Sequence, residues 1–256
     1  MKANSIEHLS YSSISMFLDC PESWRRKYIA KEPTKSSPAL VLGSAFHGTL
    51  EEMLTNPGVD VQAAYKSQWK QAVERQDVFW DEESPEQTYN DGLRLFSHKG
   101  VLGEISKIKP DKDDKGLKIE RKVELSVPGV PVPIIGFIDC ILEDGSPADF
   151  KTSARSWSSD KASYSLQALF YIAALNQMGE KVTWRFQHIV FVKTKEPKVQ
   201  FLNSLHTAGE LFFLFNVISS VWGAIEAGAF TLNPGSWRCN GKYCDFYSDC
   251  RGRFGA

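Results

Sequence analysis

Apolar and polar residues follow two different periods along this chain. Up to about residue 105, apolar positions recur every three or four residues, which is typical of amphipathic helices. From residue 117 they alternate with polar positions or form short runs, which is typical of strands. Helices followed by a mixture of strands and further helices indicate an α/β fold, with a central mixed sheet flanked by helices.

The predicted elements can be given by their ranges. Helices are predicted over residues 9–18, 22–30, 42–54, 61–79 and 86–100. Strands are predicted over residues 117–127, 132–142, 148–152, 183–192 and 199–202, with helices over 164–178 and 205–227. The charge run at residues 107–122 is interpreted as a solvated loop. We expect a single domain over residues 1–256, with a helical part over about 1–105 and a core over about 117–230.

The most apolar segment, residues 211–230, raises the question of a membrane span. Its uncharged part is shorter than the ~18 residues that a spanning helix needs, so it is interpreted as a buried core helix. The first eight residues contain no apolar core of a signal peptide. These two features predict a protein of the cytoplasm, or of the host cytoplasm if the source is a virus, with no membrane partner.

Charge excludes one class of nucleic-acid binder. Thirty Lys and Arg residues against 31 Asp and Glu residues give a net charge of −1, which excludes a globally basic DNA-binding protein. A local basic channel is compatible with this balance, because net charge does not describe how charge is distributed.

One pair of carboxylates stands out in the strand region. Asp139 ends the string Gly-Phe-Ile-Asp, and Asp149 begins the string Asp-Phe-Lys ten residues later. Asp149 and Lys151 share one face of a strand, because side chains two apart point the same way. A two-residue loop between the strands would place the two aspartates on opposite faces, whereas a three-residue loop or a bulge would place them together.

Two carboxylates on one face are suited to Mg²⁺ or Mn²⁺, which prefer oxygen ligands. A nearby lysine could position or deprotonate a water molecule, as metal-assisted phosphodiester hydrolysis requires. The alternative is a surface salt bridge on an edge strand. Acid-x-Lys triplets also occur at residues 113–115, 120–122 and 196–198, so this triplet alone is a weak signal.

The order of the motifs favours the first interpretation. His47 lies on a predicted helix upstream, and Gln167 and Tyr171 lie one helical turn apart downstream. A helix histidine, then G-x-I-D, then D-x-K, then Q-x-x-x-Y resembles the PD-(D/E)XK nucleases of the RecB-like exonuclease branch, which includes the CRISPR-associated exonucleases. The resemblance extends from about Leu9 to Cys250.

The resemblance implies roles for individual residues. His47, Asp139 and Asp149 would be ligands of Mg²⁺ or Mn²⁺, with the backbone carbonyl of Phe150 as a further ligand. The resemblance also implies a catalytic set that lines the active site and positions DNA: Asp139, Asp149, Lys151, Gln167 and Tyr171. The family more often has Glu at the position of Asp149, and either residue can bind a metal.

Alternatives to these roles remain. His47 could be a core or helix-capping histidine, and Gln167 and Tyr171 could form an ordinary half-buried helix face. Glu124, on the preceding predicted strand, is a candidate for an additional carboxylate at the site.

Three of the five cysteines, Cys239, Cys244 and Cys250, lie within twelve residues. An odd count argues against a disulfide framework, and the clustering indicates metal ligation. A closed site needs a fourth ligand, for which Cys20 and Cys140 are available. Cys140 adjoins Asp139 on a strand and therefore faces the opposite packing layer, so Cys20 is chosen.

One N-terminal and three C-terminal cysteines resemble the [4Fe–4S] site of the RecB-like iron–sulfur nucleases. Such a cluster would hold the two ends of the chain together. Cys239 and Cys244 have four intervening residues where two are usual, which leaves zinc as an alternative, and unligated thiols as a second one.

Basic and aromatic residues occur together in two places that could bind single-stranded nucleic acid. These are Trp24, Arg25, Arg26 and Lys27 in the first, and Arg155, Trp157 and Lys161 in the second. Ordinary helix packing is the alternative. The string from Gly43 to Gly48 lacks the Gly-Lys-Ser/Thr ending of a phosphate-binding loop, so any unwinding of DNA would need a partner.

These observations predict a metal-dependent DNA exonuclease with a structural iron–sulfur cluster, acting on single-stranded or end-containing DNA. Recombination, repair, and phage or CRISPR-type DNA processing are the settings that the resemblance implies, with DNA and possible helicase or recombination and adaptation proteins as partners. The alternatives are a catalytically inactive cluster-bearing subunit for DNA binding or assembly, and a zinc-stapled structural protein.

Overall fold

The computed structural model describes residues 6–80, 83–181 and 183–255 and divides into two compact units. The terminal unit comprises Met1–Thr34, Val123–Gly136 and Ala208–Ala256. The central unit comprises Lys35–Lys122 and Phe137–Thr207. The expectation of a single domain stays a prediction.

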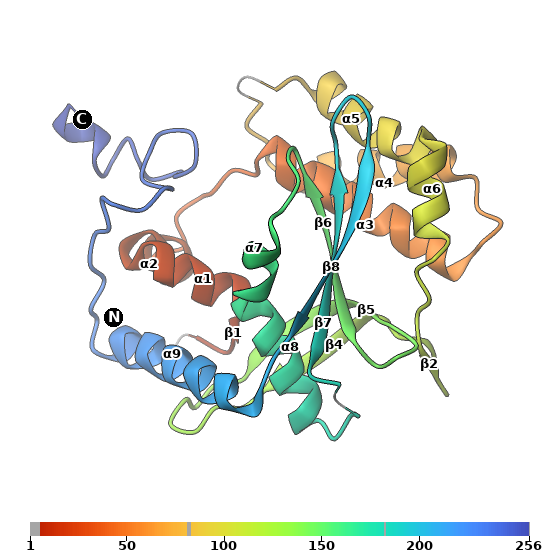
Figure 1. The fold of residues 1–256 in the computed structure, drawn as a ribbon. Helices are drawn as coiled ribbons and strands as arrows, with labels where there is room; N and C mark the ends of the chain where they lie inside the picture. Colours follow the sequence, from red (N-terminus) through yellow and green to blue (C-terminus); the bar gives the residue numbers. More distant parts are fainter. Residues whose placement is uncertain (1–5, 81–82, 182, 256) are drawn as a thin grey trace. The chain divides into compact units, whose positions relative to one another are not determined.

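The terminal unit is mainly helical. It contains β1 (Leu9–Ser10), α1 (Tyr11–Asp19), α2 (Pro21–Tyr28), α9 (Ala208–Glu226) and a 3₁₀ turn at Gly252–Phe254 (Figure 1). Ser10 caps α1 through its hydroxyl and the Ser13 backbone N–H, 3.1 Å apart. Cys20 lies between α1 and α2, because Pro21 cannot continue α1 but suits the first position of a new helix.

The helices of the central unit each begin at a capping side chain. They are α3 (Pro38–Thr55), α4 (Val61–Arg75), α5 (Pro85–Ser97), α6 (Lys99–Ile105), α7 (Ser159–Ser163) and α8 (Leu166–Gln177). The corresponding caps are Ser37, Asp60, Ser84, His98, Ser158 and Ser165. Each cap accepts a hydrogen bond from a backbone N–H of the first turn, which the helix itself leaves unpaired.

The main sheet is mixed, as predicted. Its strands run in the order β1, β5 (Ile134–Ile141), β6 (Pro147–Ser153), β7 (Arg185–Val192) and β8 (Lys198–Leu205), and β4 (Ile119–Leu125) also pairs with β5. The pairs β1–β5 and β6–β7 are parallel, whereas β5–β6 and β7–β8 are antiparallel. Helices α7 and α8 connect β6 to its parallel neighbour β7, as a crossover between parallel strands requires.

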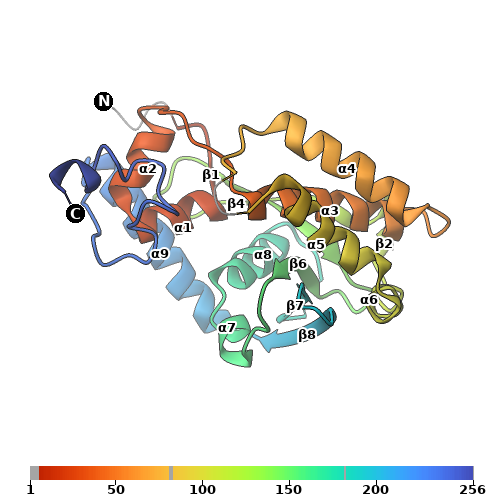
Figure 2. The same ribbon diagram turned by 90° about the horizontal axis from the view of Figure 1, so that it is seen from above.

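Helices cover both faces of strands β6–β8 in the central unit. Figure 2 shows α3, α5 and α6 on one side of these strands and α7 and α8 on the other. The hydrophobic core lies on the first side, where Phe150 and Phe191 of the sheet pack with Phe46 of α3 and Phe96 of α5. Phe46 stacks on Phe96 with ring centroids 4.7 Å apart. Because side chains alternate along a strand, burial of Phe150 on this face directs Asp149 and Lys151 to the face of α8.

The predicted loop at residues 107–122 is wrong. This segment contains a hairpin of β2 (Lys112–Asp113) and β3 (Gly116–Leu117), and its last residues begin β4. Some of its charges are paired, since Lys118 lies 3.0 Å from Asp111 and Arg121 lies 2.8 Å from Asp113, whereas Lys112, Asp114 and Lys115 are exposed. The sequence analysis missed this because charged residues in a hairpin have the same composition as a solvated loop.

Other boundaries differ for local reasons. The segment predicted as one helix over residues 86–100 is two helices, because His98 ends α5 and caps α6. The short elements β1 and α7 were not predicted, since two and five residues carry little periodicity.

The helix predicted to be fully buried has one buried face. Leu214, Ile218 and Trp222 of α9 are buried, but Phe212 and Phe213 are 71% and 59% exposed. Among the described residues, α9 is the one helix with the length and composition of a membrane span. A core helix of a soluble protein passes the same test, so this finding is weak evidence for a membrane.

Candidate active site

The turn between β5 and β6 determines whether the two aspartates meet. Cys140 pairs with Ala148 and Ile141 with Pro147, so continuing the register brings Asp139 opposite Asp149. Leu142 closes the turn by donating to the Ser146 carbonyl, at 2.9 Å, which leaves the three residues Glu143–Gly145 in the loop. Gly145 has φ +82°, a conformation that favours glycine. The loop is therefore of the kind that places both aspartates on one face.

Asp149, Lys151 and Gln167 form one hydrogen-bonded group on the face of α8. The Lys151 ammonium lies 2.6 Å from the Asp149 carboxylate, which is 2% exposed. Gln167 Nε2 donates to Asp149 Oδ1 at 2.9 Å. Asp149 Oδ2 accepts no hydrogen bond of suitable geometry, although Lys151 Nζ is 2.6 Å away. The group thus holds a buried carboxylate that is paired with the Lys151 ammonium.

Tyr171 closes the α8 side of this group. Its hydroxyl donates to the Phe137 carbonyl at 2.6 Å and lies 3.3 Å from Gln167 Nε2. Since Gln167 and Tyr171 are one helical turn apart, α8 presents both to strands β5 and β6. They are not simply a half-buried helix face, because both join polar contacts of the two strands.

A second group contains His47, Glu120 and Asp139. Each residue offers one potential ligand atom, and these three atoms lie within 4.8 Å of one another. Among the described residues, this is the one group of three or more His, Cys, Asp or Glu side chains that could hold a metal ion. His47 Nδ1, from α3, is 3.4 Å from Asp139 Oδ1. The other oxygen of Asp139 accepts the backbone N–H of Phe150 at 2.6 Å, which ties the carboxylate to β6.

Asp149 and Phe150 stand apart from this three-residue group. Asp149 contacts Lys151 and Gln167, and its ligand atoms do not belong to the group within 4.8 Å. Phe150 contacts Asp139 through its N–H, so a metal-binding role of its carbonyl stays a prediction.

Glu120 is the site residue that sequence reasoning missed. It was noted only as part of the acid-x-Lys triplet at residues 120–122, and Glu124 was considered as the extra carboxylate instead. Glu120 has φ +48° inside β4, a conformation that is uncommon for a residue other than glycine. Glu120 and Glu124 have the same parity along β4, so alternation assigns them to one face and does not indicate which of the two lies beside Asp139.

Charges at the site shift the ionisation of its carboxyl groups. Burial raises the pKa of Asp149 to about 6, even though the Lys151 ammonium favours the ionised form. Desolvation, followed by the charge of Asp139, raises the pKa of Glu120 to about 7, although much of its side chain is exposed.

His47 and Asp139 shift each other's pKa. Burial alone would raise the pKa of Asp139, but the charge and hydrogen bond of His47 outweigh it and the net shift is downward. Burial alone would lower the pKa of His47, but Asp139 outweighs it and the net shift is upward. Concentrated acidic oxygen atoms beside a neutralisable histidine form a donor set that suits a divalent cation.

Four cysteines line one cavity of about 540 Å³ in the terminal unit. They are Cys20, Cys239, Cys244 and Cys250, and none of them is in a disulfide. The fifth, Cys140, is fully buried in the core of the central unit, where burial raises the pKa of its thiol to about 12. This separation agrees with the choice of Cys20 over Cys140 as the partner of the C-terminal cysteines.

The aromatic residues proposed to contact DNA have structural partners. Trp24 is 1% exposed and packs between Phe17 and Phe230, with ring centroids 5.5 and 6.1 Å away, so the packing alternative holds for it. Trp157 lies under the Lys161 ammonium, 3.8 Å from its ring centroid, and beside His188. Trp24 is therefore unavailable to stack on a base, whereas Trp157 is half-buried and its contact with nucleic acid stays a prediction.

Comparison with known proteins agrees with the fold. The chain resembles the crystal structure of a protein described as "Putative exonuclease" from Eubacterium rectale, with a TM-score of 0.62 and 14% identity over 96% of this chain and 88% of that one. A structure described as SSO0001 matches with a TM-score of 0.39 and 14% identity, over 93% and 95% of the two chains, and carries no argument. A search of curated proteins finds no significant match.

Structural similarity at 14% sequence identity shows the fold but not the family, whereas a match to a family model shows the family. The model of the PD-(D/E)XK nuclease superfamily matches residues 8–251, nearly the whole chain. The chain therefore belongs to the PD-(D/E)XK nuclease superfamily.

Proposed function

We propose that this protein is a metal-dependent DNA exonuclease that acts on single-stranded or end-containing DNA. The observation that carries the proposal is that the register of β5 and β6 brings Asp139 and Asp149, the central carboxylates of two polar groups, opposite each other. Asp149, Lys151 and Gln167 form one, and His47, Glu120 and Asp139 form the other. Membership of a nuclease superfamily gives this arrangement its chemistry.

The residues that would hold the cation are Asp139, Glu120 and His47, with Asp149 as a further ligand. Mg²⁺ or Mn²⁺ bound there would polarise the scissile phosphate and lower the pKa of a water molecule. The donor set is rich in carboxylate oxygen, which both ions prefer.

Three side chains around the proposed cation, those of Lys151, Gln167 and Tyr171, would have different roles. Lys151, whose ammonium is 2.6 Å from Asp149, would orient the attacking water and balance charge on the phosphate. Gln167 holds Asp149 in place, because its side-chain amide donates a hydrogen bond to the carboxylate. Tyr171 holds β5, because its hydroxyl donates a hydrogen bond to the Phe137 carbonyl.

We further propose that Cys20, Cys239, Cys244 and Cys250 hold a [4Fe–4S] cluster. All four line one cavity. Their distribution, one near the N-terminus and three near the C-terminus, is the feature that supports the cluster, and a single zinc ion is the alternative.

The proposed substrate and setting extend beyond the site. DNA is the proposed macromolecular partner, and a helicase or a recombination or adaptation protein would supply unwinding, because the chain has no phosphate-binding loop motif. Recombination, repair, or phage and CRISPR-type DNA processing in the cytoplasm are the proposed settings.

The test is a nuclease assay on linear and closed circular DNA with anaerobically purified protein and Mg²⁺ or Mn²⁺. Wild type should degrade linear DNA and leave closed circles intact, and Lys151→Ala should leave both forms of DNA intact. Lys198→Ala is the matched control, because Lys198 is exposed and ends another acid-x-Lys triplet.

Three outcomes would change the proposal. Cutting of closed circles would make the protein an endonuclease. Equal activity of Lys151→Ala and Lys198→Ala would place the active site elsewhere. A folded, metal-loaded wild type that binds but does not degrade DNA would support the inactive-subunit alternative.

A further inference from the structure

Glu120 holds a backbone conformation that needs support from its surroundings. Its φ of +48° is one of three positive values at residues other than glycine in the described chain. Such conformations persist where neighbouring contacts over-determine them, and they often occur at functional sites. Because the Glu120 carboxylate reaches His47 and Asp139 from this conformation, whatever fixes the backbone also places the carboxylate.

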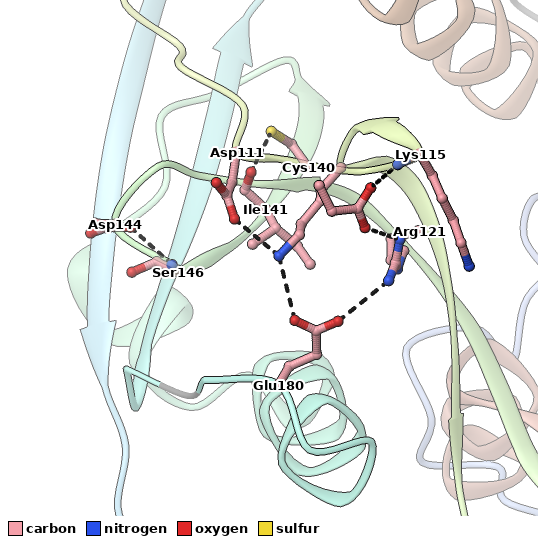
Figure 3. Close-up of polar contacts among 10 residues, drawn as sticks. Asp111, Lys115, Arg121, Cys140, Ile141, Asp144, Ser146 and Glu180 are labelled. Atoms are coloured by element: carbon pink, nitrogen blue, oxygen red, sulfur yellow. Dashed lines mark hydrogen bonds and ion pairs between the residues drawn. The ribbon is translucent and has the colours of Figure 1, made fainter.

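Two cationic side chains close to Glu120 in the sequence form ion pairs with the same carboxylate, that of Glu180. Lys118 Nζ lies 3.4 Å from Glu180 Oε2, and Arg121 Nη2 lies 3.3 Å from Glu180 Oε1. Figure 3 shows Glu180 facing Arg121 and the neighbouring ion pairs of Asp111. The Lys118 and Arg121 side chains are 13% and 25% exposed, so water screens these pairs less than ordinary surface pairs. Glu180 therefore bridges both sides of the strained residue.

Each cation also has a second acidic partner. Lys118 Nζ lies 3.0 Å from Asp111, and Arg121 Nη1 lies 2.8 Å from Asp113. The backbone at Lys118 is held as well, since its N–H donates to the Asp111 carbonyl at 2.7 Å and its carbonyl accepts from Ile141 at 2.9 Å. Loss of Glu180 alone would leave these contacts and the hairpin in place.

Glu180 is itself fixed by the end of α8. Gly179 takes φ +79°, and the Glu180 N–H donates to the Leu175 carbonyl at 3.0 Å, which closes the helix. The same helix carries Gln167, which contacts Asp149. One end of α8 thus supports the Asp149 group and the other end reaches the segment that carries Glu120.

We propose that Glu180 is a positioning residue for the metal site: by bridging Lys118 and Arg121 it holds the segment between them so that Glu120 can bind the cation. This inference rests on the proposed function of the site, and it assigns no direct contact between Glu180 and the metal. Partners that orient metal ligands typically contribute about 10- to 100-fold to metal affinity.

The test is Mn²⁺ binding by the whole protein, measured by calorimetry or by the spin-resonance signal of free Mn²⁺, without DNA. Glu180→Gln keeps the shape of the side chain and removes its charge. We expect about 10- to 100-fold weaker Mn²⁺ binding, with a Tm within about 4 °C of wild type. Glu196→Gln is the matched control, since Glu196 is 95% exposed and 3.9 Å from His98, and it should bind Mn²⁺ as wild type does.

A double variant distinguishes positioning from general stabilisation. If Glu180 acts through Glu120, then Glu120→Gln with Glu180→Gln should bind Mn²⁺ no more weakly than Glu120→Gln alone. Additive losses would overturn the inference, as would wild-type affinity in Glu180→Gln. If Glu180→Gln does not fold, Lys118→Met is used instead, because it removes the ion pair between Lys118 and Glu180. Its Mn²⁺ binding is then compared with that of Glu120→Gln and of the double variant in the same way.

The binding assay also separates this inference from the proposed nuclease activity. A wild type that binds Mn²⁺ but does not cleave DNA would contradict the nuclease proposal, and the variants would still decide the role of Glu180. A wild type that binds no Mn²⁺ would overturn both.

Discussion

The ammonium of Lys151 is held by a buried carboxylate, and this contact decides what the lysine can do. Lys151 Nζ lies 2.6 Å from the Asp149 carboxylate, and the two groups form an ion pair. A charged lysine orients water and stabilises negative charge in the transition state, whereas a neutral one would accept a proton. The geometry favours the first role.

We predict that Lys151→Ala lowers kcat by about 10²- to 10⁴-fold, the range of a positioned catalytic side chain. DNA binding and KM should change little, because the side chain acts in the transition state. Single-turnover cleavage measures the chemical step directly. A comparable rise in KM with kcat retained would show that Lys151 serves binding alone.

The pKa shifts predict how metal affinity depends on pH. Glu120 has a pKa of about 7, and that of His47 lies above its ordinary value, so both hold protons at pH 6 in the metal-free protein. A bound cation needs both groups deprotonated. Mn²⁺ affinity should therefore be about 10-fold or more weaker at pH 6 than at pH 8, as calorimetry can measure.

Glu120→Gln supplies the control for this pH dependence. It removes one of the two titrating groups, so Mn²⁺ binding should be weaker overall and should depend less steeply on pH. An unchanged slope would mean that Glu120 does not titrate with metal binding.

Most residues of the candidate site could be predicted from the sequence, but one could not. Asp139, Asp149, Lys151, Gln167 and Tyr171 were identified as candidates because the order of their motifs resembles that of the PD-(D/E)XK nucleases, and strand alternation and helical spacing indicated only which of them share a face. Glu120 was not, because it matches none of those motifs and has the same parity along β4 as Glu124. The roles of all these residues stay predictions until the variants are measured.

At the scale of elements, the packing of α5 depends on a residue without a side chain. A Cβ at Gly92 would overlap the Tyr65 hydroxyl and lie 2.8 Å from a Leu42 methyl group, so α5 can approach α3 and α4 only with glycine there. Tyr65 cannot easily move, because its hydroxyl donates to the Tyr89 carbonyl at 3.0 Å.

We predict that Gly92→Ala lowers the free energy of unfolding by about 1–3 kcal/mol, as overpacking does. Gly103→Ala in α6 is the control, because a Cβ there meets nothing within 4 Å. Its better helix propensity should raise stability by up to about 1 kcal/mol. Urea unfolding measures both, and equal effects of the two variants would contradict the packing explanation.

The elements that the sequence predicted well are those with long periodic patterns, such as α3, α8 and β7. The turn after β5 could not be resolved, because the residues Glu-Asp-Gly allow loops of two or three residues. The structure has the longer loop, which decides whether Asp139 and Asp149 face the same side. The hairpin at residues 112–117 was hidden by its charged composition.

At the scale of the whole molecule, segments far apart in the sequence form the terminal unit. Residues 1–34 and 208–256 belong to it together, so Cys20 and the three C-terminal cysteines can line one cavity. A cluster held by these residues would join chain segments separated by more than half the sequence.

We predict that Cys20→Ser loses bound iron and lowers Tm, whereas Cys140→Ala keeps its iron, because Cys140 lies in the core of the central unit. Metal analysis and visible absorbance of anaerobically purified protein measure the iron. Full iron content in Cys20→Ser, or one zinc ion in place of iron in the wild type, would contradict the proposed cluster.

The central claim is that the site around Asp139 and Lys151 hydrolyses DNA with a bound divalent cation. The most direct measurement is the release of soluble nucleotides from linear DNA in Mn²⁺, by the wild type and by Asp139→Asn. The account predicts steady release by the wild type and a loss of about 10²-fold or more in the variant. No release by the folded wild type, or equal release by Asp139→Asn, would contradict it.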